Sequence, residues 1–246
     1  MSYLSEILAD APSHYWRLAD PPGRIAFDLG SAPRHLLVDG TTEITGLGYS
    51  GPASDGGSVL VEHDGAVDSH NGITSTPSFT LEAWVWPFQL GTAGCAMAWD
   101  YTSGGASVQI TGSDHPFISS GPATLTGPAV VTRQQWHHIV GTIGPLLAEL
   151  WWDGVSQGTI VSAPAVFTKQ VLLGQGGGQL LGWISEAAIY PIVLPNARIA
   201  AHFAAADNLG QQPVYRGGGA FANSSGTGLS PADIAALIYA AVHKVY

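Results

Sequence analysis

The chain has 246 residues, of which 46% are hydrophobic and only 11% are charged, and its net charge at pH 7 is −10. Its 8 Lys and Arg residues form no basic stripe, which argues against a nucleic-acid partner and against electrostatic docking on anionic lipid. The single cysteine, Cys95, excludes an internal disulfide, and its apolar surroundings are typical of a small core residue.

The first segment, MSYLSEILAD, lacks the basic start and the long apolar stretch of a secretory signal, so no signal peptide is expected. No stretch of about 18 apolar residues occurs, so membrane insertion is not expected either. Residues 2–9 are predicted to form a short helix, because their apolar side chains share one face at helical spacing: Tyr3, Leu4, Ile7 and Leu8. HYWRL, residues 14–18, is then predicted to be a strand.

Between residues 57 and 190 the sequence is a succession of short apolar segments bounded by Gly, Pro, Asp or Ser. This spacing is typical of an antiparallel sandwich or barrel rather than of alternating strands and helices. The clearest hairpin is LAELWWDGVSQGTIV, residues 147–161, in which Asp153-Gly154 favours a type I′ turn.

The segment FTLEAWVWP, residues 79–87, combines a glutamate with two tryptophans and allows two interpretations. It is either a sugar platform with a catalytic acid or the middle of a sandwich. Successive strand residues point to opposite faces, and here both faces are largely apolar, which favours a central strand covered on both sides. Trp84 is therefore predicted to pack inside the protein, whereas Trp86, beside Pro87 at the strand end, is predicted to lie nearer to solvent.

Several segments in this order resemble a known family, the concanavalin A-like lectin/glucanase superfamily of the laminin-G type. The resemblance covers most of residues 1–205, and the segments that carry it are ILADAPSHYWRLAD, FDLGS, SFTLEAWVWP, QWHHIVGTI, LAELWWDGVSQGT and LGWISEAAIYPIVLPNARIAAHF. It implies an all-β fold, an antiparallel β-sandwich of the jelly-roll kind. In this family the aromatic strand residues are mostly framework.

Catalysis is not expected. Glucanases of this superfamily carry a Glu-x-Asp-x-x-Glu pattern on one strand, whereas Glu82, Glu149 and Glu186 each lack a carboxylate two residues away. No nucleophile motif or phosphate-binding loop occurs, so no catalytic residue is assigned. His137 and His138 are adjacent and point to opposite faces of a strand, so they are predicted to be structural rather than to hold one metal ion.

Two kinds of binding site are considered, each beside a structural alternative. Family members often hold calcium, and the resemblance places that candidate site at Asp28 in FDLGS, although the Asp-Glu of the family's closing strand is here Ser185-Glu186. The alternative for Asp28 is a turn cap. Carbohydrate binding requires an aromatic face with nearby polar groups. The candidates are Trp99, Asp100, Tyr101, Asp114 and His115, and the alternative for the tryptophan is packing at the sandwich edge.

The composition changes after the sandwich, which is predicted to span residues 1–209 and to end in a helix that Asn196 caps. Residues 210–228 are rich in Gly and Ser and are predicted to be a flexible linker. Residues 229–246 are predicted to form an amphipathic helix for assembly or anchoring, with one apolar stripe: Ile234, Leu237, Ile238, Ala241, Val242 and Val245. A helix this short is marginal alone in water, so its stripe is expected to be buried against the sandwich, copies of itself or another protein, and the flexible linker before it favours the last two.

These features together favour a non-catalytic, lectin-like protein on the surface of a bacteriophage virion, such as a decoration, fibre or minor tail protein. It is expected to be a homo-oligomer, to contact other virion proteins or itself through its last helix, and to bind host-surface carbohydrate. The main alternative is a purely structural protein that stabilises a capsid or tail without binding glycan. A glycan hydrolase is a third alternative.

Overall fold

The computed structural model describes residues 2–20, 25–39, 47–53, 57–61, 66–69, 72–88, 93–99, 105–162, 166–207, 209–211 and 213. The predicted assembly helix, residues 229–246, and most of the predicted linker lie outside the described residues. No helix in the described part of the chain is long and apolar enough to cross a membrane.

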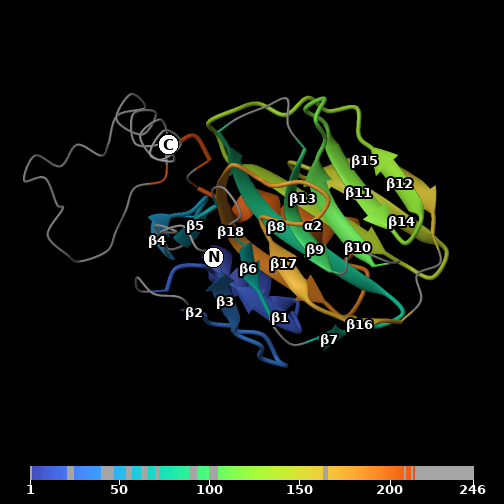
Figure 1. Cartoon of the computed structure of the whole chain (residues 1–246), viewed down its shortest axis with the longest axis horizontal. Coiled ribbons are helices and arrows are strands. Elements are labelled where there is room, and N and C mark those ends of the chain that lie inside the picture. Colours follow the sequence, from blue (N-terminus) through green and yellow to red (C-terminus); the bar gives the residue numbers. More distant parts are fainter. Residues whose placement is uncertain are drawn as a thin grey trace, which may run out of the picture.

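The described chain forms two large antiparallel sheets and two helices (Figure 1). The first sheet follows the order β15 (Val155–Val161), β14 (Leu147–Trp152), β13 (His137–Ile143), β8 (Phe79–Pro87), β18 (Gly182–Tyr190), β5 (Gly57–Val61) and β4 (Leu47–Ser50), with β1 (His14–Trp16) also paired to β18. The second sheet follows the order β12 (Ala123–Thr126), β11 (Pro116–Ser120), β10 (Ala106–Ile110), β9 (Gly94–Trp99), β17 (Val171–Leu173), β6 (Ala66–Asp68), β3 (Leu36–Asp39) and β2 (Ile25–Ala26). A small third sheet pairs β16 (Thr168–Lys169) with β7 (Ile73–Thr74).

The core between the sheets is built by alternate residues of the central strands. On β8 these are Phe79, Leu81, Ala83 and Val85, which belong to one buried apolar cluster with residues of the second sheet such as Val108. This is the arrangement that alternation in FTLEAWVWP predicts, and it confirms the jelly-roll sandwich.

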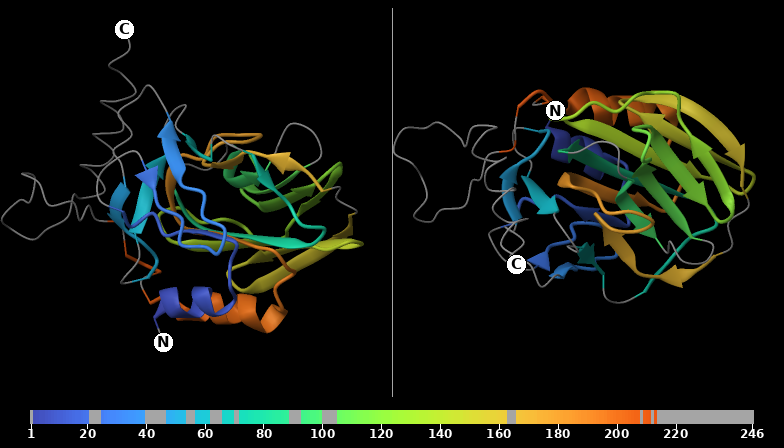
Figure 2. Two further views of the ribbon diagram at one scale, coloured as in Figure 1. Left: turned by 90° about the horizontal axis from the view of Figure 1, so that it is seen from below. Right: turned by 45° about the horizontal axis from the view of Figure 1, so that its top comes forward.

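The other face of the first sheet is also covered, by the helices α1 (Tyr3–Ala9) and α2 (Asn196–Ala205). Figure 2 shows these two helices side by side on one side of the sandwich. They form a second apolar cluster with Trp84 and Trp86 of β8. Trp84 is buried as predicted, but the expectation for Trp86 is wrong: it is only 2% exposed, because Trp136 and Trp183 pack edge-on against its ring.

The turns and helix caps agree with the sequence-based expectations at the hairpin but not at the start of α2. The hairpin between β14 and β15 is confirmed, and Asp153 and Gly154 both have positive φ, at 49° and 74°, as a type I′ turn requires. Ser2 caps α1, with its side chain accepting a hydrogen bond from the Ser5 N–H. Asn196, however, is the first residue of α2 rather than its cap, because Pro195 occupies the cap position and supplies no side-chain hydrogen bond.

Candidate functional site

Trp99, the first sequence-predicted sugar contact, is a core residue in this structure. Its indole N–H donates to the carbonyl oxygens of Ile73 and Lys169, at 3.2 and 3.3 Å, and its ring packs edge-on against Phe79 and Phe167. The ring is 2% exposed and offers no face to a ligand, so the packing alternative describes it. The other two predicted residues of this segment, Asp100 and Tyr101, lie outside the described residues.

The second predicted patch, Asp114 and His115, occupies the turn between β10 and β11. Both side chains are half-buried, and His115 Nδ1 lies 2.7 Å from the carbonyl oxygen of Ala129, to which it donates. The turn follows the last residue of β10, whereas Trp99 pairs with the first residue of that strand. Five strand residues, about 16 Å, therefore separate Trp99 from Asp114 and His115, and the fold does not bring these residues together.

Asp28, the candidate calcium ligand, is buried and binds hydrogen-bond donors instead. Its Oδ1 accepts from the backbone N–H groups of Tyr15 and Gly30, both at 2.8 Å, and its Oδ2 accepts from the backbone N–H of Arg34 at 2.7 Å and from His14 Nδ1 at 2.8 Å. Four donors aimed at one carboxylate repel a cation. In the described part of the chain no group of three or more His, Cys, Asp and Glu side chains could hold a metal ion. These residues do not fit a calcium site. Asp28 instead links the turns around β1 through its four hydrogen bonds.

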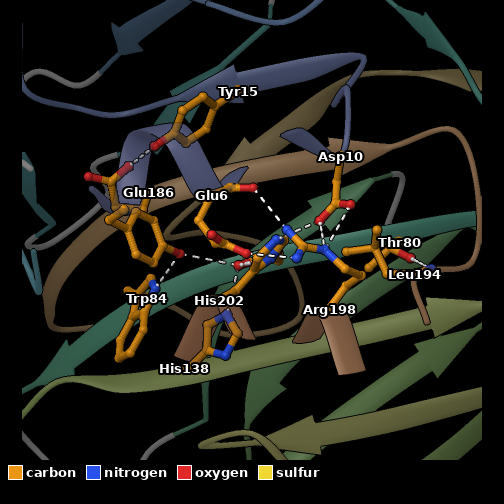
Figure 3. Close-up of polar contacts among 12 residues, drawn as sticks. Glu6, Asp10, Tyr15, Thr80, Trp84, His138, Glu186, Leu194, Arg198 and His202 are labelled. Carbon is orange, nitrogen blue, oxygen red and sulfur yellow. Dashed lines mark hydrogen bonds and ion pairs between the residues drawn. The ribbon is translucent and has the colours of Figure 1, made fainter. Parts of the chain in front are cut away.

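The most concentrated set of polar side chains lies on the outer face of the first sheet, beneath the two helices (Figure 3). Glu82, at the centre of β8, is fully buried. Its carboxylate accepts hydrogen bonds from His138 Nε2 at 2.8 Å, from His202 Nδ1 at 2.9 Å and from the Tyr3 hydroxyl at 3.2 Å. His202 Nε2 donates in turn to Asp10 at 2.8 Å. These contacts join α1, α2 and the sheet, and we call Glu82, His138, His202, Tyr3 and Asp10 the buried polar cluster.

The geometry of this cluster fixes its protonation. Both ring nitrogens of His202 face carboxylates, Glu82 and Asp10, so both donate and the ring is an imidazolium. Burial alone would lower the pKa of His202, but the two carboxylates outweigh it and raise that pKa above its ordinary value of 6.5. Burial would likewise raise the pKa of Glu82, but His202 and His138 outweigh it and lower that pKa far below 4.5. His138 makes its contact to Glu82 through Nε2, and its buried Nδ1 has no hydrogen-bond partner among the described residues.

The chemistry that this cluster can perform is limited by its closure. Glu82 is 0% exposed, and Trp84 and the helices separate it from solvent, so it is not available as an acid to a substrate. Glu186, its neighbour on β18, is equally buried, accepts a hydrogen bond from the Tyr15 hydroxyl and pairs with Arg17 at 3.6 Å. The cluster therefore has a structural role, because it holds the two helices to the sheet. Of the two interpretations of FTLEAWVWP, the structure supports the central strand of a sandwich.

The two histidines that follow Trp136 lie on opposite faces, as predicted. His138 joins the buried polar cluster, whereas His137 Nδ1 lies 2.8 Å from Asp153 Oδ2 and its ring stacks on Trp152. Each side chain is thus engaged by its own set of protein partners on its own face of the sheet.

The pH dependence of stability follows from the opposite pKa shifts of Glu82 and His202. Glu82 has a lowered pKa in the folded protein, so its contribution is complete above pH 4.5 and is lost as the pH falls. His202 has a raised pKa, so its contribution is complete below pH 6.5 and is lost as the pH rises through the folded value. We expect the melting temperature to be highest between about pH 4.5 and 6.5, measured by circular dichroism from pH 4 to 9.

In the same scan the variant His202→Gln should lose the decline on the alkaline side, because it has no proton to release there. His115→Gln, which removes a histidine outside the cluster, should keep that decline. If the melting temperature of His202→Gln fell at alkaline pH as it does in the wild type, the decline would not come from deprotonation of His202.

A second polar surface lies on the outer face of the second sheet, where no described helix packs (Figure 2). Registered neighbours on β10, β11 and β12 build two rows across this face, which we call the polar face: Ser107–Ser119–Thr124 and Gln109–Phe117–Thr126. The intervening residues Val108 and Ile118 point inward to the core. Thr124 and Thr126 are exposed, Gln109, Phe117 and Ser119 are half-exposed, and Ser107 is buried beneath them.

Sequence reasoning missed the polar face, although a signal for it exists. In ASVQI, PFISS and ATLT, polar or aromatic residues alternate with Val108, Ile118 and Leu125. Each segment alone is too short to distinguish a half-exposed strand from a loop. Their alignment side by side is a product of the strand register, which the sequence does not display.

Comparisons with known proteins agree on this architecture. The family model of the concanavalin A-like lectin/glucanases superfamily matches residues 61–200, more than half of the chain. No curated protein matches the chain. Among solved structures, domain 4 of an extracellular arabinanase from Geobacillus stearothermophilus, in complex with arabinotriose, matches with a TM-score of 0.61 and 16% identity, over 78% of this chain and 97% of that one.

Two toxin binding domains are also similar. The binding domain of Paraclostridial Mosquitocidal Protein 1 matches with a TM-score of 0.58 and 14% identity, over 80% of this chain and 52% of that one. The binding domain of Botulinum Neurotoxin DC, in complex with SialylT, matches with a TM-score of 0.52 and 14% identity over the same shares. At these identities the likeness shows the fold alone. The match of the family model supplies the classification: the chain belongs to the concanavalin A-like lectin/glucanase superfamily.

Proposed function

We propose that this chain is a non-catalytic, lectin-like module that binds carbohydrate at the polar face. The observation that carries the proposal is the pair of rows across β10–β12, which sets the aromatic ring of Phe117 between an amide and hydroxyl groups on an accessible sheet surface. An aromatic ring packs against the C–H face of a sugar, while neighbouring amides and hydroxyls bond its hydroxyl groups. Similar structures include domains seen with arabinotriose and with SialylT, which supports this class of ligand.

Catalysis is not part of the proposal. The strand carboxylates Glu82 and Glu186 are buried under the helices and engaged by histidine, tyrosine and arginine side chains. No Asp or Glu lies on the three strands that form the polar face. A glycosidase needs a pair of carboxyl groups on the two sides of the bond it cleaves, and this face offers none.

We further propose that the module is displayed on a bacteriophage virion, as a homo-oligomer held to other virion proteins or to itself through residues 229–246. The support is the low charge of the chain, its Gly/Ser-rich segment after residue 209 and the apolar stripe of its last segment. Leu209 packs in the cluster under the helices, on the side of the sandwich opposite to the polar face. An attachment through the segments that follow would therefore leave the polar face directed outward.

Phe117→Ala tests the proposed site. We expect it to weaken binding to host-envelope polysaccharide about tenfold or more, equivalent to about 1.4 kcal/mol, because the main apolar contact for a sugar ring is lost. Phe27→Ala is the matched control, since Phe27 is 47% exposed and lies outside the polar face. The measurement is calorimetric titration of the wild type and both variants with ligands selected on a glycan array.

If Phe117→Ala and Phe27→Ala lost equal amounts of affinity for polysaccharide, the polar face would not be the binding site. Absence of binding by the wild type to any polysaccharide would instead favour a purely structural role in a capsid or tail.

A further inference from the structure

The polar face contains no ionic group. Its six side chains are three kinds of neutral group: hydroxyls, one amide and one phenyl ring, contributed by Ser107, Gln109, Phe117, Ser119, Thr124 and Thr126. Between residues 106 and 126, which cover all three strands and their turns, the only Asp, Glu, Lys or Arg is Asp114. Electrostatic attraction of an anionic ligand therefore has no source on the strands of this face.

The amide of Gln109 is held in a fixed orientation. Its Nε2 donates to Ser107 Oγ at 2.6 Å, and Ser107 Oγ lies 2.6 Å from Ser119 Oγ, so three side chains form one hydrogen-bonded chain. The backbone of Gly177, at a φ of +73°, passes so close that a Cβ there would lie 3.2 Å from both polar atoms of the amide. A fixed amide offers one donor and one acceptor side by side, which suits the adjacent hydroxyl groups of a sugar ring.

The basic residues of the described chain are placed elsewhere. Arg17 pairs with Glu186, and Arg198 of α2 pairs with Glu6 and Asp10 of the α1 segment, on the side of the sandwich that the helices cover. The remaining ones, Arg34, Arg133 and Lys169, are not on β10, β11 or β12. Recognition of a sugar carboxylate or phosphate normally relies on an Arg or Lys side chain or on several converging N–H groups. The net charge of −10 adds a general repulsion of anionic glycans.

We infer that the polar face selects neutral glycans and discriminates against glycans that carry sialic acid, uronic acid or phosphate. The inference rests on the proposed carbohydrate-binding function and specifies its ligand class. Discrimination arises because an acidic group placed on this face would lose its hydration without gaining a cation. Neutral hydroxyl groups would instead exchange water for the Gln109 amide and for the hydroxyls of Ser119, Thr124 and Thr126, whereas the buried Ser107 only holds the amide in place. The hydrogen-bonded row and the phenyl ring thus act as a filter for charge as well as a binding surface.

The test uses the full chain and pairs of oligosaccharides that share one neutral core and differ by a terminal sialic acid or uronic acid. We expect the neutral member of each pair to bind at least tenfold more tightly, which corresponds to a difference in binding free energy of about 1.4 kcal/mol or more. Binding of the neutral member should change little with ionic strength, because no ion pair contributes to it. Equal or tighter binding of the acidic members would overturn the inference while leaving carbohydrate binding intact. Failure of both members of every pair, across the whole array, would overturn the proposed function together with it.

Two variants connect the preference to the polar face. Thr126→Lys places a cation beside Phe117 on the exposed edge strand. We expect it to lower, several-fold, the ratio of the affinity for the neutral oligosaccharide to the affinity for the acidic one. Thr159→Lys introduces the same charge on β15 of the other sheet and serves as the control, for which the ratio should stay unchanged. An identical shift in both variants would assign the discrimination to net charge rather than to this face and would overturn the inference.

Discussion

Replacing Glu82 by alanine is expected to lower the free energy of unfolding by about 3–5 kcal/mol, because it leaves a buried histidine cation without its main partner. His202 would keep only Asp10, and the Tyr3 hydroxyl would lose an acceptor while still receiving the Trp84 indole N–H at 2.7 Å. The loss should be larger than for an exposed ion pair, which contributes about 0–1 kcal/mol.

Glu149→Ala provides the matched control for Glu82→Ala. Glu149 lies on the same face of the same sheet but is only half-buried, and it accepts a hydrogen bond from the Ser156 hydroxyl. We expect its removal to lower the free energy of unfolding by about 1 kcal/mol or less. The measurement is urea denaturation of the wild type, Glu82→Ala and Glu149→Ala. Glu82→Gln, which keeps the volume and one acceptor, should fall between the two. Losses of equal size at Glu82 and Glu149 would show that the buried polar cluster does not hold the helices to the sheet.

Replacing Asp28 by alanine is expected to cost about 3 kcal/mol or more, because three backbone N–H groups and one histidine lose a common acceptor. The local backbone cannot recover these bonds by a small shift, since Gly30 lies where an added Cβ would be 2.3 Å from the Ser13 carbonyl oxygen. The measurement is thermal and urea denaturation with added calcium and again with EDTA.

Asp20→Ala is the control for Asp28→Ala, since the Asp20 carboxylate lies nearby, is half-buried and accepts a hydrogen bond from the Phe27 N–H at 3.3 Å. Its loss should be about 1 kcal/mol. A calcium-dependent rise in wild-type stability that disappears in Asp28→Ala would contradict the purely structural role of Asp28 and support a calcium site there.

The buried polar cluster explains how helices as short as α1 remain in place. α1 has only seven residues and buries two side chains, Tyr3 and Ile7, so apolar packing alone gives it limited stabilisation. The contacts of Asp10 with His202 and Arg198, at 2.8 Å each, fasten its end to α2. The two helices that cover the first sheet therefore depend on each other, although 192 positions separate Asp10 from His202.

The strands and the sandwich could be predicted from the sequence because their information is local. Alternation in FTLEAWVWP placed four side chains toward each face, and the Asp153-Gly154 pair set the hairpin turn. Segment order alone indicated the superfamily. The same local reasoning failed at Trp86, whose burial depends on Trp136 and Trp183, which come from other parts of the chain.

By itself the sequence determined the fold class, the absence of the glucanase carboxylate pattern, and the scarcity of basic groups that underlies the proposed preference for neutral ligands. Only the tertiary structure decided which polar residues meet. Glu82 joins histidines 56 and 120 positions away, and Phe117 joins Gln109 and Thr126 through strand register. The physical reason is that short-range periodicity specifies which face a side chain takes, whereas pairing between distant strands and helices specifies its neighbours, and binding chemistry depends on the neighbours.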